Sequence, residues 1–290
     1  MSNHIETWFV KQFGSTVDTL AQQKGSRLRR TVRRQERVRG RYAFIDQIGA
    51  TTAVEITTRY EDSPLIQTPH ARRRVTMKNI AWGELIDGFD KVRMLIDPAN
   101  AYVQNAGYAI GRKMDDIIIE ALYSDAYSGE EGNTVVSFPA SQVIASGGTG
   151  LTVAKLRQAR KMLRAADVDL QASGPIWCVV HAEQIDDLLG DTNVTSADYN
   201  TVRTLVAGEV ESFLGFNFVH VERLPTNASN ERRVFVYTSD ALALAIGEEP
   251  NSRIAPRPDK RFMLYAYWET VFGATRLEEV KVVEIDCVEA

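Results

Sequence analysis

Residues 90–122, DKVRMLIDPANAYVQNAGYAIGRKMDDIIIEAL, carry the strongest helical periodicity in the chain. Because proline suits the first turn of a helix, Asp97-Pro98 predicts where this helix begins. Apolar residues then recur at steps of three or four, as one buried helix face requires. They are Val103, Ala106, Ile110, Met114, Ile117, Ile118, Ala121 and Leu122. We expect one long helix over about 98–124, roughly 37 Å in length.

A second helix is predicted over residues 150–163, GLTVAKLRQARKML. Thr152 is a good N-cap, and Leu156, Ala159 and Leu163 mark its buried face. The continuous apolar run PIWCVVHA, residues 175–182, indicates a buried strand. Helices and strands are mixed without a regular alternation, so the sequence favours an α+β fold over a doubly wound sheet.

The last sixty residues contain several strand signals. Residues 232–247 suggest a strand, a turn and then either a strand or a helix, between which periodicity cannot choose. Residues 248–260, EEPNSRIAPRPDK, are rich in proline and are interpreted as a hinge. Residues 261–272 and 276–288 are interpreted as the two long strands of a hairpin that turns near Gly273.

Residues 42–80 change to the two-residue period of strands. Val54, Ile56 and Thr58 alternate with polar neighbours, and so do Val75 and Met77 among the arginines. EDSPLIQTPH, residues 61–70, supplies prolines and polar turn residues between them. The pattern predicts a long two-stranded ribbon with its tip near residues 62–70. Its apolar side chains are too few for a core of its own, so we expect the ribbon to lie against another subunit.

Residues 27–41, RLRRTVRRQERVRGR, contain eight arginines and one glutamate. Residues 1–41 hold ten basic and three acidic residues, a net charge of +7, and the whole chain carries −4, which leaves −11 for the rest. A basic arm on an acidic body can bind nucleic acid or other copies of that body. The arm has few apolar residues, so we expect it to be mobile or held by a partner.

Two observations weigh against a dedicated nucleic-acid-binding protein. The isoelectric point of the chain is about 5.7, whereas such proteins are ordinarily basic. No aromatic residue lies between Gly25 and Arg41 to stack on bases. Sequence-independent nucleic-acid binding through residues 27–41 therefore remains as the alternative hypothesis.

Enzyme motifs are missing from the sequence. His4, His70, His181 and His220 have neither the spacing of a zinc protease nor paired cysteines nearby. There is no Gly-x-Ser-x-Gly turn and no dinucleotide-binding glycine motif. The sequence predicts no catalytic residue, no metal site and no cofactor. No run of about 18 apolar residues occurs, so no membrane association is expected.

Several stretches, taken together and in order, resemble the major capsid proteins of tailed bacteriophages, which have the Hong Kong ninety-seven type capsid fold. The stretches cover nearly the whole chain, although each alone is weak. They are IETWFVKQF (5–13), QQKGSRLRRTVR (22–33), DQIG (46–49), TPHARRRV (68–75), residues 90–122, residues 150–163 and LLGDTNVTSADYNTVRTLVAGEVESFLGF (188–216).

The resemblance implies an α+β fold with five parts. They would be an N-terminal basic arm at 1–41, an extended β-ribbon loop at 42–80, a peripheral domain at 81–175 with the spine helix at about 98–124, an axial domain at 176–250, and strands at 251–290 that complete the peripheral domain.

The resemblance also implies a function. Copies of the chain would assemble into hexamers and pentamers, and these into an icosahedral head shell around double-stranded DNA, which they would contact non-specifically. The location would be the virion, with assembly in the cytoplasm of the bacterial host. Other implied partners are a portal, decoration proteins and a scaffolding protein, the last expected to be separate because no helical scaffolding block precedes the arm. We expect inter-subunit contacts from Arg27, Arg29, Arg30, Arg33, Arg34, Arg37, Arg72, Arg73 and Arg74.

Overall fold

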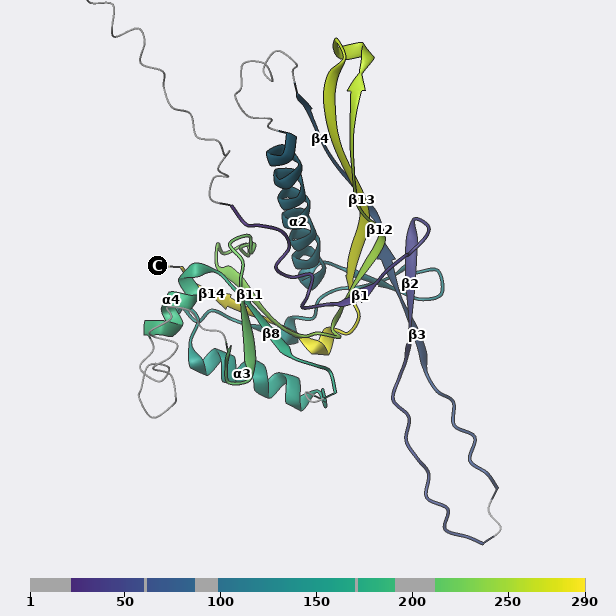
Figure 1. Ribbon diagram of the computed structural model, residues 1–290. Helices are drawn as coiled ribbons and strands as arrows, with labels where there is room; N and C mark the ends of the chain where they lie inside the picture. Colours follow the sequence, from purple (N-terminus) through teal and green to yellow (C-terminus); the bar gives the residue numbers. More distant parts are fainter. Residues whose placement is uncertain (1–21, 60–61, 87–98, 170–171, 191–211, 290) are drawn as a thin grey trace, which may run out of the picture. The chain divides into compact units, whose positions relative to one another are not determined.

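A computed structural model of the chain describes residues 22–59, 62–86, 99–169, 172–190 and 212–289 (Figure 1). The helix start predicted at Asp97-Pro98 lies outside these ranges. The chain divides into two compact units. The first comprises Met1–Ser26, Asn79–Arg112 and Glu249–Thr270, and the second Arg27–Lys78, Lys113–Glu248 and Val271–Ala290.

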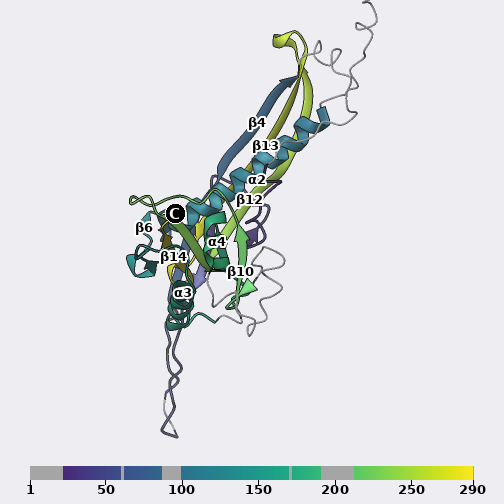
Figure 2. The same cartoon turned by 90° about the vertical axis from the view of Figure 1, so that its left-hand side faces the viewer.

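The first unit contains most of a long helix. It also contains the parts of three long strands that fall within residues 79–112 and 249–270. The helix α2 spans Ala99–Tyr123, which confirms the predicted helix over its described part. The strands are β4 (Lys78–Ile86), β12 (Leu242–Arg257) and β13 (Met263–Arg276), and with β1 (Arg33–Gln35) they form a sheet in the order β1-β12-β13-β4. Figures 1 and 2 both show α2 running beside β12 and β13.

Two predictions about these strands are wrong. Residues 248–257 continue strand β12 instead of forming a hinge, and the chain turns at the short 3-10 helix η4, Pro258–Lys260. Gly273 lies inside β13, where a Cβ atom would come 2.1 Å from the backbone oxygen of Thr76. Glycine here permits two backbones to approach closely, and the sequence interpretation mistook it for a turn.

The second unit contains a six-stranded sheet in the order β7-β14-β11-β8-β10-β9. Its strands are β7 (Val143–Ile144), β8 (Ile176–Val180), β9 (Ser212–Phe213), β10 (Phe216–His220), β11 (Arg232–Thr238) and β14 (Val282–Cys287). β14 pairs with β11 instead of β13, so residues 276–288 form no hairpin with residues 261–272. The sheet draws strands from all three ranges expected for the peripheral and axial domains. Short 3-10 helices, Ala140–Gln142 and Glu279–Lys281, precede β7 and β14.

One face of this sheet is covered by α3 (Val153–Ala165) and α4 (Ala182–Gly190). The N-cap prediction is confirmed, because the Thr152 hydroxyl accepts a hydrogen bond from the backbone N–H of Lys155. Leu156, Ala159 and Leu163 are fully buried and pack with apolar side chains of β8, β11 and β14. The helix therefore presents one stripe to the sheet and leaves its other side outward.

The opposite face of the sheet is covered by the beginning of the basic arm. Tyr237 of β11 points away from the α3 face, and its hydroxyl forms a 2.7 Å hydrogen bond with the hydroxyl of Thr31. Leu28 is fully buried, and its backbone N–H donates to Asp115 of α2 at 3.1 Å. The expectation that the arm has little to bury is wrong for residues 27–32, because the chain's own sheet and helix supply their partners.

The third sheet has the order β2-β3-β5-β6, with β2 at Tyr42–Ile48, β3 at His70–Thr76, β5 at Ala126–Ser128 and β6 at Thr134–Val136. β2 and β3 pair antiparallel from Tyr42↔Thr76 to Ile48↔His70. This pairing confirms the base of the predicted ribbon. The strand predicted around residues 54–58 does not form, because regular structure stops at Ile48.

The ribbon base also has a core of its own, contrary to expectation. Ala43, Ile45, Val75 and Met77 are buried against Ala243, Ala245 and Leu277 of the same unit. Only the loop beyond the paired strands, residues 49–69, lacks such a core, and this loop extends away from the sheet in Figure 1.

Candidate inter-subunit interface

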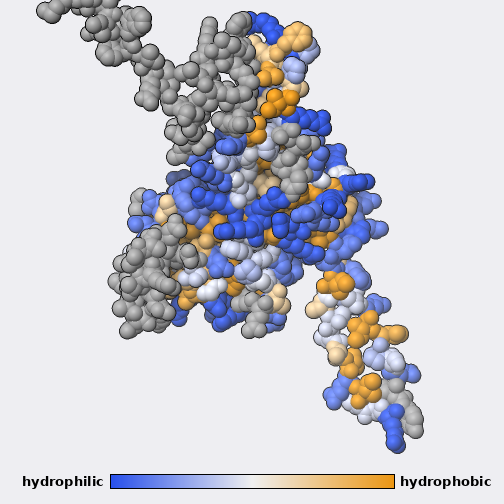
Figure 3. Space-filling view, viewed as in Figure 1, coloured by the Kyte–Doolittle hydropathy of each residue, from blue (hydrophilic) through white to orange (hydrophobic). Residues whose placement is uncertain are grey.

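The loop between β2 and β3 presents apolar side chains to solvent. Leu65 is 99% exposed, and Val54, Ile56 and Ile66 are 48–60% exposed. Figure 3 shows hydrophobic surface at several places along the extended loop. Apolar side chains that gather on one projecting segment are typical of an interaction surface, since monomeric proteins rarely expose such patches. We call residues 49–69 the ribbon loop.

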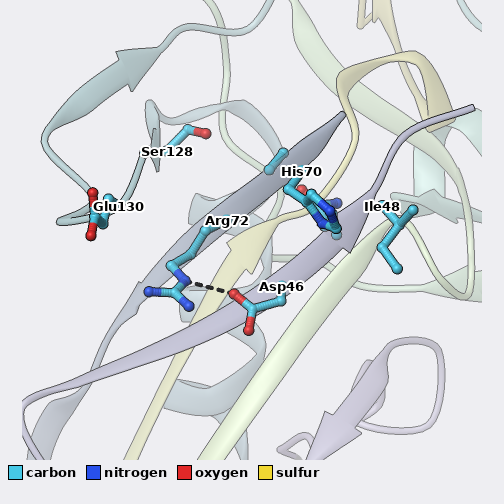
Figure 4. A pocket seen from close by; sticks show the side chains of 9 residues that line it. Asp46, Ile48, His70, Arg72, Ser128 and Glu130 are labelled. Atoms are coloured by element: carbon cyan, nitrogen blue, oxygen red, sulfur yellow. Dashed lines mark hydrogen bonds and ion pairs between the residues drawn. The ribbon is translucent and has the colours of Figure 1, made fainter. Parts of the chain in front are cut away.

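Arg72 lies on the surface at the base of the ribbon loop. Its Nε atom is 2.6 Å from a carboxylate oxygen of Asp46, and the two side chains are 40% and 71% exposed. The hydrogen bond from Arg72 lowers the pKa of Asp46. Figure 4 shows this pair in a shallow cavity with His70 beside it and Glu130 on the neighbouring β5–β6 turn. The cavity therefore offers cationic and anionic groups together at the surface.

Arg73 points in the opposite direction and is buried. Its guanidinium donates to Glu279 at 2.8 Å and to the backbone oxygen of Leu277 at 3.0 Å. Successive side chains of a strand point to opposite faces, so Arg73 shares the core side of Val75. We exclude Arg73 from the candidate interface because its side chain is buried within its own subunit.

Arg74 is half-buried between two aromatic rings. Its guanidinium carbon lies 4.8 Å from the ring centre of Tyr42 and 4.5 Å from that of Tyr127. The absence of a side chain at Gly132 makes room for it, since a Cβ there would lie 2.7 Å from the Arg74 side chain. Cation–π contacts of this kind fix the direction of the guanidinium. Arg74 thus belongs to the ribbon base and faces its edge.

The arm arginines divide into two groups. Arg27 is anchored within the chain, because its guanidinium donates to the backbone oxygen of His220 at 2.6 Å, and Arg29 is half-buried. A second group is exposed and pairs with no carboxylate of the described residues. This group consists of Arg30, Arg33, Arg34 and Arg37.

A cluster of histidines and carboxylates supports the anchored part of the arm. Glu222 forms ion pairs with His181, at 2.6 Å, and with His220. Burial opposes ionisation of Glu222, but the hydrogen bond from His220 and the nearby imidazoles outweigh it and lower its pKa. Arg232 and Glu289 extend the cluster through a 2.7 Å ion pair. The cluster thus connects the position of Arg27 to the ends of β8 and β10.

The sequence interpretation missed the most exposed residues of the ribbon loop as contact candidates. It used the alternation at Val54 and Ile56 only to predict a strand, and it treated Leu65 and Ile66 as part of a turn. The available signal was the presence of large apolar residues between prolines 64 and 69, where turns are usually polar.

Comparison with protein families supplies the identity. The sequence profile of the family described as "Phage capsid protein" matches residues 5–289. The chain belongs to this phage capsid protein family. Members of the family are structural proteins that form virion shells, and the family is not an enzyme class. This phage capsid protein is therefore a component of a virion. No curated protein matches its sequence.

Solved structures confirm the fold of the capsid protein. The capsid of cyanophage P-SCSP1u matches with a TM-score of 0.77 and 13% identity, over 100% of this chain and 96% of that one. The capsid of Ralstonia phage GP4 matches with a TM-score of 0.75 and 11% identity, over 98% and 96%. The capsid of the native GTA particle matches with a TM-score of 0.71 and 14% identity, over 99% of this chain and 97% of that one. The fold is therefore the Hong Kong ninety-seven type.

Capsid chains of this family assemble as multiple copies. Within the described residues, no helix of the capsid protein is long and apolar enough to cross a membrane. Both cysteines, Cys178 and Cys287, are free and buried.

Proposed function

We propose that copies of this capsid protein form hexamers and pentamers, and that these build an icosahedral head shell around double-stranded DNA. The observation that carries the proposal is the ribbon loop, which exposes Val54, Ile56, Leu65 and Ile66 on a segment without a core of its own. A neighbouring copy laid under this loop would remove these side chains from water. Membership of a family whose chains form shells supports the same partner.

The parts of the chain take distinct roles in this proposal. The ribbon loop and its base, residues 42–76, lie over an adjacent subunit. The helix α2, as the spine, and the hairpin of β12 and β13 build the peripheral domain. The six-stranded sheet with α3 and α4 builds the axial domain around the capsomer centre, so this domain includes β7, α3 and β14 as well as residues 176–248.

Charged side chains direct the contacts. Arg72 and the exposed arm arginines Arg30, Arg33, Arg34 and Arg37 meet carboxylates of the neighbouring copy. Guanidinium groups bind carboxylates through two parallel hydrogen bonds, which lysine cannot do. Interfaces of this kind bury about 800 Å² per partner, and closure of the shell multiplies their effect because each copy contacts several others.

Other partners follow from the same role. A separate scaffolding protein guides curvature during assembly in the bacterial cytoplasm, a portal occupies one vertex, and decoration proteins bind the outside. The alternative function, sequence-independent nucleic-acid binding by residues 27–41, has one supporting observation in the exposed arm arginines. The isoelectric point of about 5.7 favours an inter-subunit arm over this alternative.

Electron microscopy of the expressed full-length protein, with and without its scaffolding protein, tests the proposal. We expect closed shells with hexamers and pentamers from the wild type, and folded subunits without shells from Arg72→Glu. The double variant D46R/R72D is the control, since it restores an ion pair inside the ribbon but reverses the charge at position 72. It should recover subunit stability without recovering shells.

Two results would contradict the proposal. The first is a wild-type protein that stays monomeric at every concentration tested. The second is an unchanged particle yield from Arg72→Glu, which would refute the role of the ribbon base. The additional variant Arg74→Glu should also block assembly, but it loses two cation–π contacts and is expected to destabilise the subunit by about 1 kcal/mol.

A further inference from the structure

The outward face of α3 carries only positive charge. The helix spans Val153–Ala165 and contains five basic residues and no aspartate or glutamate. Four of the basic residues recur at helical spacing and form one stripe, which we call the α3 cation stripe: Arg157, Arg160, Lys161 and Arg164. Figure 1 shows α3 packed below β8 and β11 of the six-stranded sheet.

The fifth basic residue, Lys155, does not belong to the stripe. It is buried and donates three hydrogen bonds, to the backbone oxygens of Thr149, Gly150 and Asp286 at 2.7–3.0 Å. Burial lowers the pKa of Lys155. The helix thus uses one lysine to join its N-terminal turn to β14 and directs its other cations away from the sheet.

Within the stripe, Arg157, Lys161 and Arg164 are exposed, and Arg160 is half-buried. Arg160 lies against the turn at Gly215, where a Cβ would be 2.6 Å from its guanidinium. Its Nε atom is buried without a hydrogen-bond partner among the described residues. Arg160 lines two cavities, one between α3 and the 174–176 segment and one beside Leu214. The guanidinium is therefore fixed in place with donors left over.

None of the four cations forms an ion pair with a carboxylate in the part of the chain that the structure describes. Protein surfaces ordinarily mix charges of both signs, because a single-sign field repels itself. A surface of this kind is stabilised when an anionic partner occupies it. The α3 cation stripe is therefore available to an anion from outside the subunit.

The side chains that lie beside the four cations indicate which kind of anion binds there. Protein interfaces centre on aromatic or large apolar side chains. The exposed residues beside the stripe are Ala154, Gln158 and Ala165, and no large hydrophobic residue of α3 is exposed. A phosphate backbone needs only charge, and Arg157 to Arg164 covers about 10 Å of helix, over which one DNA strand presents about three phosphates.

We propose that the α3 cation stripe binds the phosphate backbone of duplex DNA and is the surface of this subunit that contacts the packaged genome. The inference rests on the proposed function, in which the shell encloses DNA. It goes further by identifying the face of the subunit that contacts this DNA. The beginning of the arm packs on the opposite face of the six-stranded sheet, through Thr31 and Tyr237. The arm and the stripe are therefore separable in experiment.

The test compares two triple variants of the full-length subunit that each remove three positive charges. The variant R157Q/K161Q/R164Q removes the exposed part of the stripe, and R30Q/R33Q/R34Q removes three arm charges. Glutamine retains helix propensity close to that of arginine and lysine, and Arg160 is kept because it packs on Gly215. Binding to random-sequence duplex DNA is measured by fluorescence anisotropy across a salt series.

We expect the stripe variant to flatten the slope of log affinity against log salt by about 2.7, since each phosphate contact contributes about 0.9. At 0.1 M salt its affinity should fall on the order of 10²-fold. The arm variant should keep most of the wild-type slope, and R157K/K161R/R164K, which retains the charges, should behave like the wild type. An unchanged slope in the stripe variant, or an equal loss in both triple variants, overturns the inference.

Electron microscopy of the same preparations separates this inference from the proposed function. If the wild type forms no shells, the proposed function fails whatever the DNA titration gives. If the stripe variant folds but forms no shells while its DNA binding is intact, the stripe binds protein and the inference is overturned. Shells from both proteins, with weaker DNA binding in the variant alone, support it.

Discussion

Arg276 is the largest fully buried side chain among the described residues, and it is basic. Its guanidinium donates to the backbone oxygens of Leu122, Ser124 and Val136 at 2.9–3.2 Å, and burial lowers its pKa. We predict that Arg276→Leu lowers the free energy of unfolding by about 3–5 kcal/mol, because three carbonyls lose their donor. Urea denaturation of the full chain measures this.

The exposed ion pair Arg257–Asp259 supplies the control, with side chains 44% and 52% exposed. Arg257→Leu should leave the urea midpoint unchanged, since exposed pairs contribute little. An Arg276→Leu variant as stable as the wild type would show that the buried guanidinium contributes no net stability.

A second prediction concerns neighbouring carboxylates of β14. Burial raises the pKa of Asp286, and the charge of Glu284 raises it further. When folding raises the pKa of a carboxyl group, the protein becomes less stable as the pH rises. The loss occurs between the pKa of the group in the unfolded chain, about 3.9, and its higher pKa in the folded protein. Asp286→Asn should therefore be more stable than the wild type at pH 7 and no more stable at pH 3, as measured by urea midpoints across pH.

Glu284→Gln is the matched variant on the same strand. Glu284 is nearly buried, with 3% exposure, and forms a bidentate ion pair with Arg233. Its replacement leaves the arginine unpaired, so stability at pH 7 should fall by about 3 kcal/mol. If Asp286→Asn and Glu284→Gln changed the stability at pH 7 in the same direction, the conclusion that the ionised Asp286 destabilises the fold would be wrong.

The three consecutive arginines of β3 show what the sequence could and could not predict about single side chains. Strand periodicity places Arg73 on the face of Val75, so its burial was available from the sequence. The partners of Arg72 and Arg74 were not, because Asp46 and Tyr127 are brought near by strand pairing and by the β5–β6 hairpin. Neither pairing has a signal at the arginines themselves.

Among the segments of the chain, the beginning of the arm behaves as part of the core. Leu28 is fully buried beneath the six-stranded sheet, whereas Arg30, two residues later, is exposed. We predict that Leu28→Ala lowers the free energy of unfolding by about 2–5 kcal/mol, measured by thermal or urea denaturation. Arg30→Ala is the control and should change stability by less than about 0.5 kcal/mol. Equal effects would mean that the arm is not packed.

The ribbon loop should behave in the opposite way. Replacing Val54, Ile56, Leu65 and Ile66 by serine removes no intramolecular core, so the free energy of unfolding should stay within about 0.5 kcal/mol of the wild type. Particle yield, counted by electron microscopy, should fall at least about tenfold, the loss expected if the change removes about 1.4 kcal/mol or more of assembly free energy per copy.

Val135→Ser is the control for the loop variant, because Val135 is an equally exposed apolar residue, 54%, on strand β6. It should leave particle yield unchanged. Full yield from the loop variant would remove the ribbon loop from the interface.

Elements with strong periodicity were predictable from the sequence, and elements defined by pairing were not. The apolar stripes of α2 and α3 and the apolar run of β8 have local signals, and all three are confirmed. The partner of β14 has no local signal, since β7 and β11 lie far from it in the chain. Pro250 and Pro256 were misleading because the long strand β12 continues through them to Arg257.

The assembled particle should differ from the free subunit mainly at the ribbon loop. We predict that backbone amides of residues 49–59 and 62–69 exchange rapidly in free subunits and at least about tenfold more slowly in shells. Burial under a neighbouring copy removes their access to water. Amides of β11, already in the centre of a sheet, serve as the internal control. Unchanged exchange in the loop would contradict the proposed interface.

The architecture as a whole was predictable only through resemblance. Composition and periodicity indicated a mixed α+β chain, and the order of the matching stretches indicated the capsid fold. The ranges of the domains stay a prediction, but the pairing of β7, at residue 143, with β14, at residue 282, could not be predicted. Such non-local pairing leaves no trace in a window of sequence.

The position of β14 has a consequence for the synthesis of the protein. The ribosome releases the ribbon loop more than two hundred residues before Val282–Cys287, and the six-stranded sheet cannot close without that strand. Until then the nascent chain exposes the apolar side chains of the ribbon loop while its six-stranded sheet is incomplete. Chains interrupted before residue 282 should therefore aggregate instead of entering shells, and quality control at translation becomes a condition of capsid yield.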